Sequence, residues 1–450
     1  MKEFSATLSR WISNSAPIND ERLLDLARHG LADTIGGMLA GAEEPVVQQI
    51  FQSASRWGDG EGTVVGRSKK LPLPQAAIVN ATAAHALDYD DNYLVAITHP
   101  SAVMVPALLA IGERENSSGT DLLDAYIVGL EAQKRIGLLM NPEHYERGWH
   151  ATSTIGLIGA VAGCARLLKL SSEQVNAALS IGMTMAFGSK IQFGTSVKPL
   201  HAGIAAERAV TATFMALDGI SGVSEPFVGK WSFSDLFAGH PKPDVERALY
   251  QLGETPFGIE EPGLLPKRFP CCGSIHFTLD SIEHLLREHS FSLEEIEKIE
   301  TTVVKRFYDN LRYTRPSTGA AARFSMHYSV ACYLTKGNLS LSDFEDSATQ
   351  NENVLPWLDR IEMNILENPI DREHVEQTRI VLKNGTVHEH STRALYGSAK
   401  NPFQEKDRKE KFMDCAGCLT PEQATALYDK LSSLNKKTPV SEITKDLPFQ

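Results

Sequence analysis

The chain has 450 residues, of which 42% are hydrophobic and 8% aromatic, and its formal net charge at pH 7 is -12. This composition fits a globular protein with a large core, and the length favours two or more domains. An acidic chain without a basic run is poorly suited to nucleic acid or to an anionic membrane, so neither is expected as a partner.

A cytoplasmic location is expected from three features. No stretch reaches the length of a membrane span, and residues 1–10 lack the apolar core of a secretion signal. Six cysteines in so long a chain do not indicate a disulfide framework, so a reducing compartment is the default.

Residues from about 20 to 265 are predicted to be mostly helical. Asp20 is suited to cap a helix that runs to Ala40, in which Leu23, Ala27 and Leu31 recur at helical spacing. Their broad apolar faces indicate that the helices of this region pack against each other. Further helices are expected at residues 73–87, 101–113, 120–139 and 198–217. A Gly- and Ala-rich helix is expected directly after His150, and another after a cap at Ser171 or Ser172.

The pattern changes near Pro262. Residues 297–304 alternate like a strand, and residues 378–393 predict a β-hairpin with a type I′ turn at Asn384-Gly385. Helices are expected at 277–288, 325–336, 341–347 and, past residue 400, at 420–434. The expected fold is mostly α with an α+β part: a helical domain at 1–265, an α+β lid domain at 266–400, and a C-terminal helical segment at 401–450 that returns to the helical domain.

The densest group of titratable side chains lies in residues 85–101. It contains His85, Asp88, Asp90, Asp91 and His99 between two apolar, helix-like runs. Acids in such a place must shift their pKa values, pair with cations or hold a ligand. A solvated loop between two helices is the alternative, although Pro, Gly and Ser do not dominate the stretch.

Further clusters of reactive residue types lie near helix starts and at the change of pattern. One at a time, these side chains have ordinary explanations, such as a solvated lysine or a packed tyrosine. Together they favour a site, because helix N-termini attract anions and the clusters supply cations and imidazoles. They are His150; Lys198 with His201; Lys267, Arg268, Cys271, Cys272 and His276; and His327 with Tyr328.

No metal and no cofactor are expected. Asp88, Asp90 and Asp91 could bind Mg²⁺, as acidic helix motifs do in prenyl-transferring all-α enzymes, but the spacing differs and no second acidic motif follows. Residues 415–418 and 388–390 have metal-like spacing without a matching ligand pair. Nucleotide-binding glycine motifs and a serine nucleophile elbow are also absent from the sequence.

These clusters, in this order, resemble the MmgE/PrpD family, which includes 2-methylcitrate dehydratase, cis-aconitate decarboxylase and iminodisuccinate epimerase. The resemblance covers nearly the whole chain. It implies a large helical domain and a smaller α+β lid, usually in a homodimer, with the active site in the cleft between them. It is carried by His85-Ala-Leu-Asp-Tyr-Asp-Asp with His99-Pro-Ser, Gly148-Trp-His150, Lys198-Pro-Leu-His, Lys267-Arg-Phe-Pro and Lys411-Phe-Met-Asp-Cys415.

The resemblance also implies the residues of the site. Two positions depart from the decarboxylase pattern: Asn92 stands where a Thr is common, and Cys272 where the decarboxylases carry a His. The loop from Asp88 to His99 is also one residue longer than in the decarboxylases. The resemblance therefore indicates membership of the family, but it does not identify which of the family's reactions this chain catalyses. By the decarboxylase pattern the site would be lined by Asp88, His99, His150, Lys198, Lys267 and Tyr328.

A mechanism follows from the charges of these groups. Lys198, Lys267 and Arg268, with Asn92, would bind the carboxylates of a small di- or tricarboxylate substrate and stabilise carbanion character. The expected catalytic residues take the proton transfers. They are His99 or His150 as general base or acid, Tyr328 or Cys272 for the second proton, and Asp88 to orient and charge a histidine.

Four functions stay open on the sequence alone. The first is a cofactor-independent lyase that dehydrates or decarboxylates an acid similar to 2-methylcitrate or cis-aconitate. The second is an epimerase of a dicarboxylate such as iminodisuccinate, for which Cys272 would be a second base. The third is a carboxylate-binding protein without turnover, against which the His, Lys and Tyr set argues. The fourth is a Mg²⁺-dependent all-α enzyme.

Overall fold

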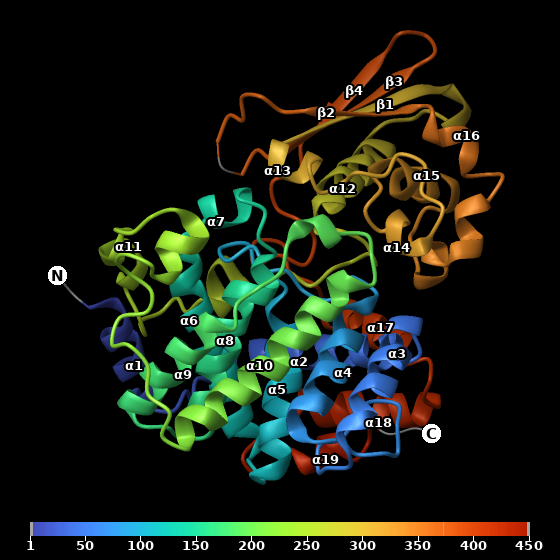
Figure 1. Ribbon diagram of the computed structural model, residues 1–450. Helices are drawn as coiled ribbons and strands as arrows, with labels where there is room; N and C mark the ends of the chain where they lie inside the picture. Colours follow the sequence, from blue (N-terminus) through green and yellow to red (C-terminus); the bar gives the residue numbers. More distant parts are fainter. Residues whose placement is uncertain (1–2, 372, 448–450) are drawn as a thin grey trace.

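The computed structural model describes residues 3–371 and 373–447. It consists of a helical body and a smaller α+β unit that lies against one end of the body (Figure 1). The expected mostly α fold with an α+β part is confirmed. Within the described ranges, no helix combines the length and the apolar character that a membrane crossing requires.

The helical body contains the helices of the first half of the chain together with those that follow residue 404. Several of them are buried on nearly all sides, α8 most completely, because α5, α6, α9 and α10 pack around it. The helices are α1 Phe4–Asn14, α2 Glu21–Gly41, α3 Pro45–Ala54, α4 Leu73–Ala86, α5 Pro100–Arg114, α6 Gly119–Met140, α7 Glu143–Glu146, α8 Ala151–Leu167, α9 Ser172–Thr184, α10 Val197–Leu217, α11 Val245–Leu249, α17 Glu405–Cys415, α18 Pro421–Ser432 and α19 Ser441–Thr444.

Local sequence signals set several helix ends. The Asp20 carboxylate accepts hydrogen bonds from the first backbone amides of α2, and the Ser171 hydroxyl caps α9 in a capping box, so both predicted caps are confirmed. Helices α4 and α10 approach closely at Gly203, where a Cβ atom would lie 2.6 Å from the Ile78 carbonyl oxygen. Small residues therefore permit the tight packing of the body.

The α+β unit has one four-stranded sheet in the order β2-β1-β3-β4. Strand β1 pairs in parallel with β2 and antiparallel with β3, which in turn pairs antiparallel with β4. Alternate residues of β1 and β3 are buried because α12 and α15 cover one face (Figure 1). The elements are α12 Gly273–Glu288, β1 Ile296–Val303, α13 Lys305–Tyr308, α14 Gly319–Ala322, α15 Met326–Lys336, α16 Leu355–Leu358, β2 Ile361–Ile365, β3 Glu376–Leu382 and β4 Val387–His390.

Three details of this unit differ from the sequence-based expectations. The hairpin between β3 and β4 forms, but its turn is not type I′, because Gly385 has a φ of 84° whereas Asn384 is not left-handed. The Leu382 amide donates to the Thr386 carbonyl, so three residues form the loop instead of two. Residues 341–347 form short 3₁₀ turns rather than an α-helix, and strand β2 was not expected.

The chain after residue 404 packs into the helical body. Phe412, Leu427, Leu434 and Val440 belong to the same hydrophobic core as the helices from α1 to α10. A separate core lies between the sheet and α12 and α15. The domain boundaries at residues 265 and 400 stay a prediction, and two segments, around residue 265 and around residue 400, connect the two parts.

Candidate active site

The loop between α4 and α5 is held in place by its own backbone and by the connection to the α+β unit. Asp88 has a φ of 52°, in the left-handed region that Asp and Asn tolerate better than most residues. Asn92 and Leu265 form an antiparallel bridge, with two amide-to-carbonyl hydrogen bonds of 2.9 Å. This bridge brings Lys267, two residues farther along the chain, over the start of the loop.

Asp88 lies between two ammonium groups. Its Oδ1 is 2.5 Å from Lys198 Nζ, at the start of α10, and 2.9 Å from Lys267 Nζ. Lys267 Nζ also donates to the Asp88 carbonyl oxygen at 2.7 Å, and its side chain is fully buried. Burial alone would raise the pKa of Asp88, but the two lysines hold it well below its ordinary value. His85 and His99 hold the pKa of the buried Asp90 carboxyl below its ordinary value, so a second carboxylate balances the second ammonium group.

Two histidines of the loop have defined tautomers. His99 Nδ1 lies 3.0 Å from the Asp91 carbonyl oxygen, which can only accept, so Nδ1 carries the proton and Nε2 is free. His85 Nδ1 lies 2.8 Å from the Asp90 carboxylate, and the same reasoning gives His85 a free Nε2. Burial, with the positive charges of Lys267 and Lys198, lowers the pKa of His99 well below its ordinary value. Both rings are neutral at pH 7.

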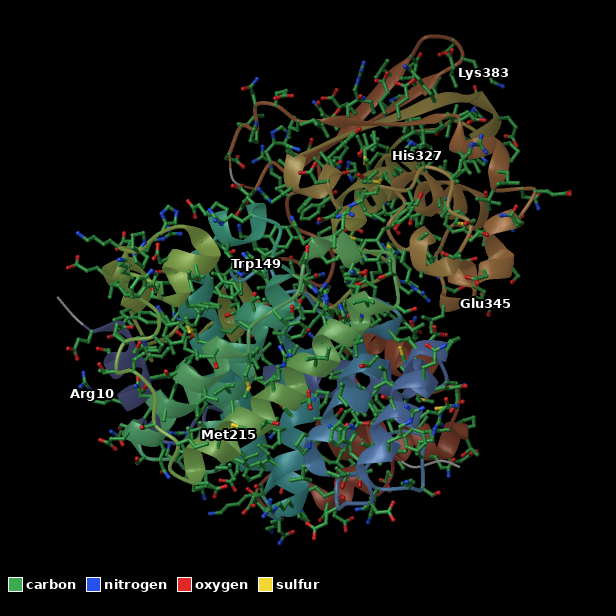
Figure 2. All side chains as sticks on the ribbon, viewed as in Figure 1. Arg10, Trp149, Met215, His327, Glu345 and Lys383 are labelled. Atoms are coloured by element: carbon green, nitrogen blue, oxygen red, sulfur yellow. The ribbon has the colours of Figure 1, made fainter. Side chains whose placement is uncertain are left out.

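His150 comes from the end of the segment before α8. Its Nδ1 lies 3.0 Å from Nδ1 of His201, on the first turns of α10. Burial, together with the charge of Lys198, lowers the pKa of His150 well below its ordinary value. Trp149, the residue before it, lies near the junction of the body and the α+β unit (Figure 2).

A cavity of about 80 Å³ joins these groups at that junction. Six of the residues expected from the sequence line it: Asp88, Asn92, His99, His150, Lys198 and Cys272. Lys267 does not line the cavity, but its ammonium group contacts Asp88, so it belongs to the same cluster. The rest of the wall comes from both parts of the molecule and includes Tyr145, Phe193, Leu265, Phe277, Arg306, Phe307, Asn310 and Phe324.

Several polar atoms of this cluster are sealed from solvent and have no hydrogen-bond partner. They are Asp88 Oδ2, Asp90 Oδ1, His85 Nε2 and His150 Nε2. An unpaired buried polar atom is destabilising by about 1–3 kcal/mol. Asp88 and His150 line the cavity, so their unpaired atoms indicate a place prepared for a ligand.

Two expected residues are not brought to the cavity. The Tyr328 hydroxyl donates to the Asp343 carbonyl oxygen at 2.7 Å, inside the core of the α+β unit, and the neighbouring His327 lies within that unit in Figure 2. Arg268 forms an ion pair with Glu283 on α12. Tyr328 packs in the core of the α+β unit and Arg268 pairs with a carboxylate, and neither contact can be inferred from the sequence positions.

The structure adds residues that the sequence did not single out for the site. Arg306, on the short helix α13, lines the cavity, and among the described residues it has no carboxylate within ion-pair distance. The Tyr145 hydroxyl, which bonds to Asn310, supplies a phenol where Tyr328 was expected. His85, Asp90 and His201 were visible in the motifs, but no pattern assigned them a role.

Four residues could offer ligands to a metal ion. Single atoms of His85, Asp88, Asp90 and His99 lie within 4.8 Å of one another. However, Asp88 Oδ1 already contacts two ammonium groups, which repel a divalent cation. The donor set therefore fits a divalent cation poorly.

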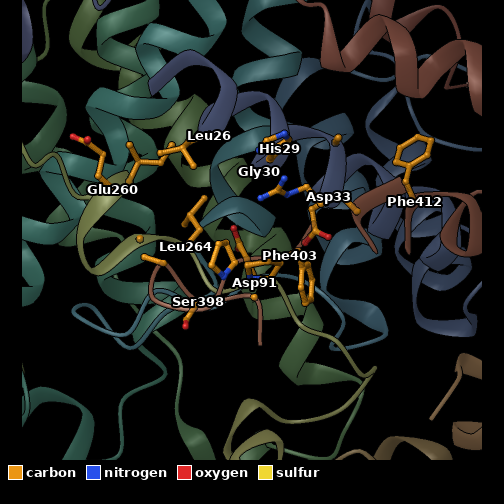
Figure 3. A pocket seen from close by; sticks show the side chains of 18 of the residues that line it. Leu26, His29, Gly30, Asp33, Asp91, Glu260, Leu264, Ser398, Phe403 and Phe412 are labelled. Atoms are coloured by element: carbon orange, nitrogen blue, oxygen red, sulfur yellow. The ribbon is translucent and has the colours of Figure 1, made fainter. Parts of the chain in front are cut away.

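A larger cavity of about 320 Å³ borders the same loop at Asp91 (Figure 3). Its wall is mostly apolar and includes Leu26, Leu264 and Phe403 together with Asp33. The Asp33 carboxylate pairs with Lys411 at 2.7 Å. Size alone would favour this cavity, but among the described residues no lysine lines it, and its histidine, His29, lies 3.8 Å from the Glu405 carboxylate.

Comparison with known families identifies the family of this chain. The model of the MmgE/PrpD N-terminal domain matches residues 6–246, and that of the MmgE/PrpD C-terminal domain matches residues 269–433. The chain belongs to the MmgE/PrpD family. The resemblance inferred from the motifs is thereby confirmed.

Curated relatives in this family span most of the chain. Cis-aconitate decarboxylase of Homo sapiens is 26% identical over 406 residues, which cover 87% of this chain and 83% of the relative. The Mus musculus enzyme of the same name is 27% identical, covering 92% and 88%. Cis-aconitate decarboxylase of Aspergillus terreus is 24% identical, covering 98% and 94%.

Proposed function

We propose that this protein is a lyase of the MmgE/PrpD type that acts on a small tricarboxylate, with decarboxylation of a cis-aconitate-like acid as the leading reaction. The observation that carries the proposal is the cavity between the two parts, where Lys198 and Lys267 flank Asp88 and His150 Nε2 has no partner among the described residues. The names of the curated relatives support the same reaction class.

The charges of the site suit a polyanion. A substrate carboxylate that enters the cavity meets the ammonium group of Lys198 on one wall, and the charge of Lys267 lies beside Asp88. Arg306 faces it from the α+β unit and can bind a second carboxylate with two parallel hydrogen bonds. Buried cations attract an anion strongly because little water screens them.

Loss of CO₂ leaves an electron pair on the substrate carbon. The preorganised ammonium groups stabilise the developing negative charge through the remaining carboxylates, without rearrangement during the reaction. His150 then protonates the carbon from Nε2. His99, with a free Nε2, is suited to accept a proton, which a dehydration of the same type of acid would require.

The epimerase remains the second candidate because Cys272 lines the cavity with His99 and His150. Burial raises the pKa of the Cys272 thiol, so the thiol is protonated at neutral pH and can donate a proton more readily than accept one. This state favours a lyase that needs one proton donor over an epimerase that uses Cys272 as its base.

The proposal is tested by incubating the purified protein with cis-aconitate, 2-methylcitrate and iminodisuccinate in separate reactions in D₂O, followed by NMR. The expected product from cis-aconitate has lost CO₂ and carries one deuterium. Asp88→Asn is the control, because it removes the charge between the lysines with little change in volume. Turnover of iminodisuccinate alone, with deuterium at its stereocentre, would replace the lyase by the epimerase.

A further inference from the structure

The contact between His150 and His201 has a property that the site does not otherwise use. The two Nδ1 atoms face each other at 3.0 Å. A hydrogen bond between two such atoms needs a proton on one of them and a lone pair on the other. The pair therefore contains one shared proton, and its position determines the tautomer of both rings.

The tautomer of His150 decides what its cavity-facing nitrogen can do. When His201 holds the shared proton, His150 accepts at Nδ1 and carries its own proton on Nε2. Because Nε2 is buried and has no partner in the described part of the chain, this proton is available only to a ligand in the cavity. When the shared proton moves to His150 Nδ1, the Nε2 proton can leave without charging the ring.

The two rings differ in their access to water. His150 is 2% exposed and lies against Phe193, edge to face, with ring centroids 5.0 Å apart. His201 is 5% exposed, and its Nε2 is not among the buried atoms that lack a partner, so it keeps contact with solvent. Phe187 packs against the His201 ring and fixes its orientation. The pair thus connects the sealed cavity to the outside.

We propose that His201 is a proton-relay residue that passes the shared proton to His150 Nδ1 as His150 gives up its Nε2 proton, so that neither ring becomes charged. The inference rests on the proposed lyase function. The substrate C–C bond breaks, CO₂ leaves, and its electron pair stays on carbon. The His150 Nε2–H bond breaks as the new C–H bond forms, the shared proton passes from His201 Nδ1 to His150 Nδ1, and His201 Nε2 takes a proton from water or a buffer acid.

The relay ends with the shared proton on His150 and a proton on His201 Nε2. To regain the starting tautomers, His150 Nε2 takes up a proton from water that enters the cavity as CO₂ and product leave. His201 Nε2 releases a proton to solvent, and the shared proton returns to His201 Nδ1. The sum is one substrate and one proton converted to one product and one CO₂. A dehydration or an epimerisation has no net proton uptake, so the relay is specific to decarboxylation.

Two substitutions separate a relay from a purely structural contact. His201→Asn places an amide near the position of Nδ1 and keeps a hydrogen bond to His150, but it cannot pass a proton. His201→Ala removes both and leaves space for a free imidazole molecule. We expect each to lower kcat on cis-aconitate by at least about tenfold, within the range of general acid catalysis, with a KM that changes less. Added imidazole should restore a large part of the kcat of His201→Ala.

The outcomes distinguish the two ideas. Wild-type kcat for His201→Asn in dilute buffer would overturn the relay, as would loss of kcat in both variants without imidazole rescue when circular dichroism shows intact folding. A second readout needs no substrate: ¹⁵N–¹H correlation of histidine-labelled protein. We expect one shared Nδ1 proton in the pair that exchanges with water faster than the sealed His85 Nδ1 proton. Two independent rings would overturn the relay, even if every acid tested fails as substrate.

Discussion

The Lys267 ammonium group contacts two oxygens of Asp88, and its side chain has no exposed surface. Protein atoms, and not water, therefore hold its charge in a fixed position. We expect Lys267→Ala to lower kcat by at least about two orders of magnitude, the typical effect of removing a preorganised charge that faces a developing anion. The fold should persist because Lys198 still neutralises Asp88. Steady-state kinetics measures the change in kcat, and circular dichroism shows whether the variant is folded.

Lys267→Met is the matched control for volume. It fills the space of the lysine without its charge, so it should be as inactive as Lys267→Ala but closer to the wild type in melting temperature. Near-normal kcat/KM in either folded variant would end the assignment of Lys267 to the site.

Arg306 should act on substrate binding more than on the chemical step. Arg306→Ala removes a charge-assisted hydrogen bond of about 1.5–3 kcal/mol, which predicts a KM raised by roughly 10- to 100-fold with a smaller change in kcat. Arg312→Ala is the control, because Arg312 is exposed and bonds to the Lys190 carbonyl oxygen. Equal kinetics in the two variants would remove Arg306 from the substrate-binding set.

Chelators should leave activity intact. The group formed by His85, Asp88, Asp90 and His99 has ligand spacing, but two ammonium groups already contact its Asp88 oxygen. The measurement is turnover before and after EDTA treatment and gel filtration. Loss of turnover that Mg²⁺ or Zn²⁺ restores would contradict the side-chain mechanism.

The residues of the site could be predicted where a motif fixes their position. Asp88, His99, His150 and Lys198 lie at ends of helices, and those ends meet at the junction. The orientation of a side chain inside a helix depends on packing across the fold, so Tyr328 was misplaced. Arg306 could not be found, because a one-turn helix has no periodic pattern.

At the scale of elements, long helices with clear caps were predictable and the short irregular elements were not. Helices α2 and α10 lie within a residue or two of their expected bounds. Strand β2 is five residues long and is stabilised by pairing with β1, which the local sequence does not encode. The predicted type I′ turn at Asn384-Gly385 was wrong because the loop length, and not the dipeptide alone, determines the turn type.

Helix α10 carries Lys198 and His201, so its distance from α4 matters for the site. In Gly203→Ala the added methyl group would lie 2.6 Å from the Ile78 carbonyl oxygen and would also meet the Thr82 hydroxyl. We expect a loss of about 1–3 kcal/mol, the usual range for overpacking, seen as a lower midpoint in urea.

Gly156→Ala is the matched control for this helix contact. Gly156 lies inside α8, where the nearest atom to an added Cβ is 3.6 Å away, an ordinary contact. A helical glycine with such space gains stability from alanine, by about 0.4–1 kcal/mol. Equal shifts for the two variants would contradict the close packing of α4 and α10.

At the scale of the whole molecule, buried neutral histidines predict acid sensitivity. Burial lowers the pKa of His144 to about 3, of His201 to about 4 and of His276 to about 3, from 6.5. Between pH 6.5 and about 4 the unfolded chain binds more protons at these rings than the folded chain, so stability falls as the pH falls.

Buried carboxyl groups act in the opposite direction. Burial raises the pKa of Asp91 and of Glu376 to about 7 and that of Asp280 to about 6, so the folded chain keeps protons that the unfolded chain releases above about pH 4. The histidines with lowered pKa values, which include His85, His99 and His150, outnumber them. The melting temperature should therefore fall from pH 7 to 5, and a flat or rising profile would contradict the neutral buried rings.

The small volume of the catalytic cavity has a kinetic consequence. Ligand pockets commonly enclose roughly 300–1,000 Å³, and about 80 Å³ lies far below that range. We expect substrate to enter when the α+β unit moves away from the body, and product to leave in the same way. Because Lys267 lies on the connecting segment, such a movement would also separate Lys267 from Asp88. The movement, rather than bond cleavage, would then set the turnover rate, which we expect to be sensitive to solvent viscosity.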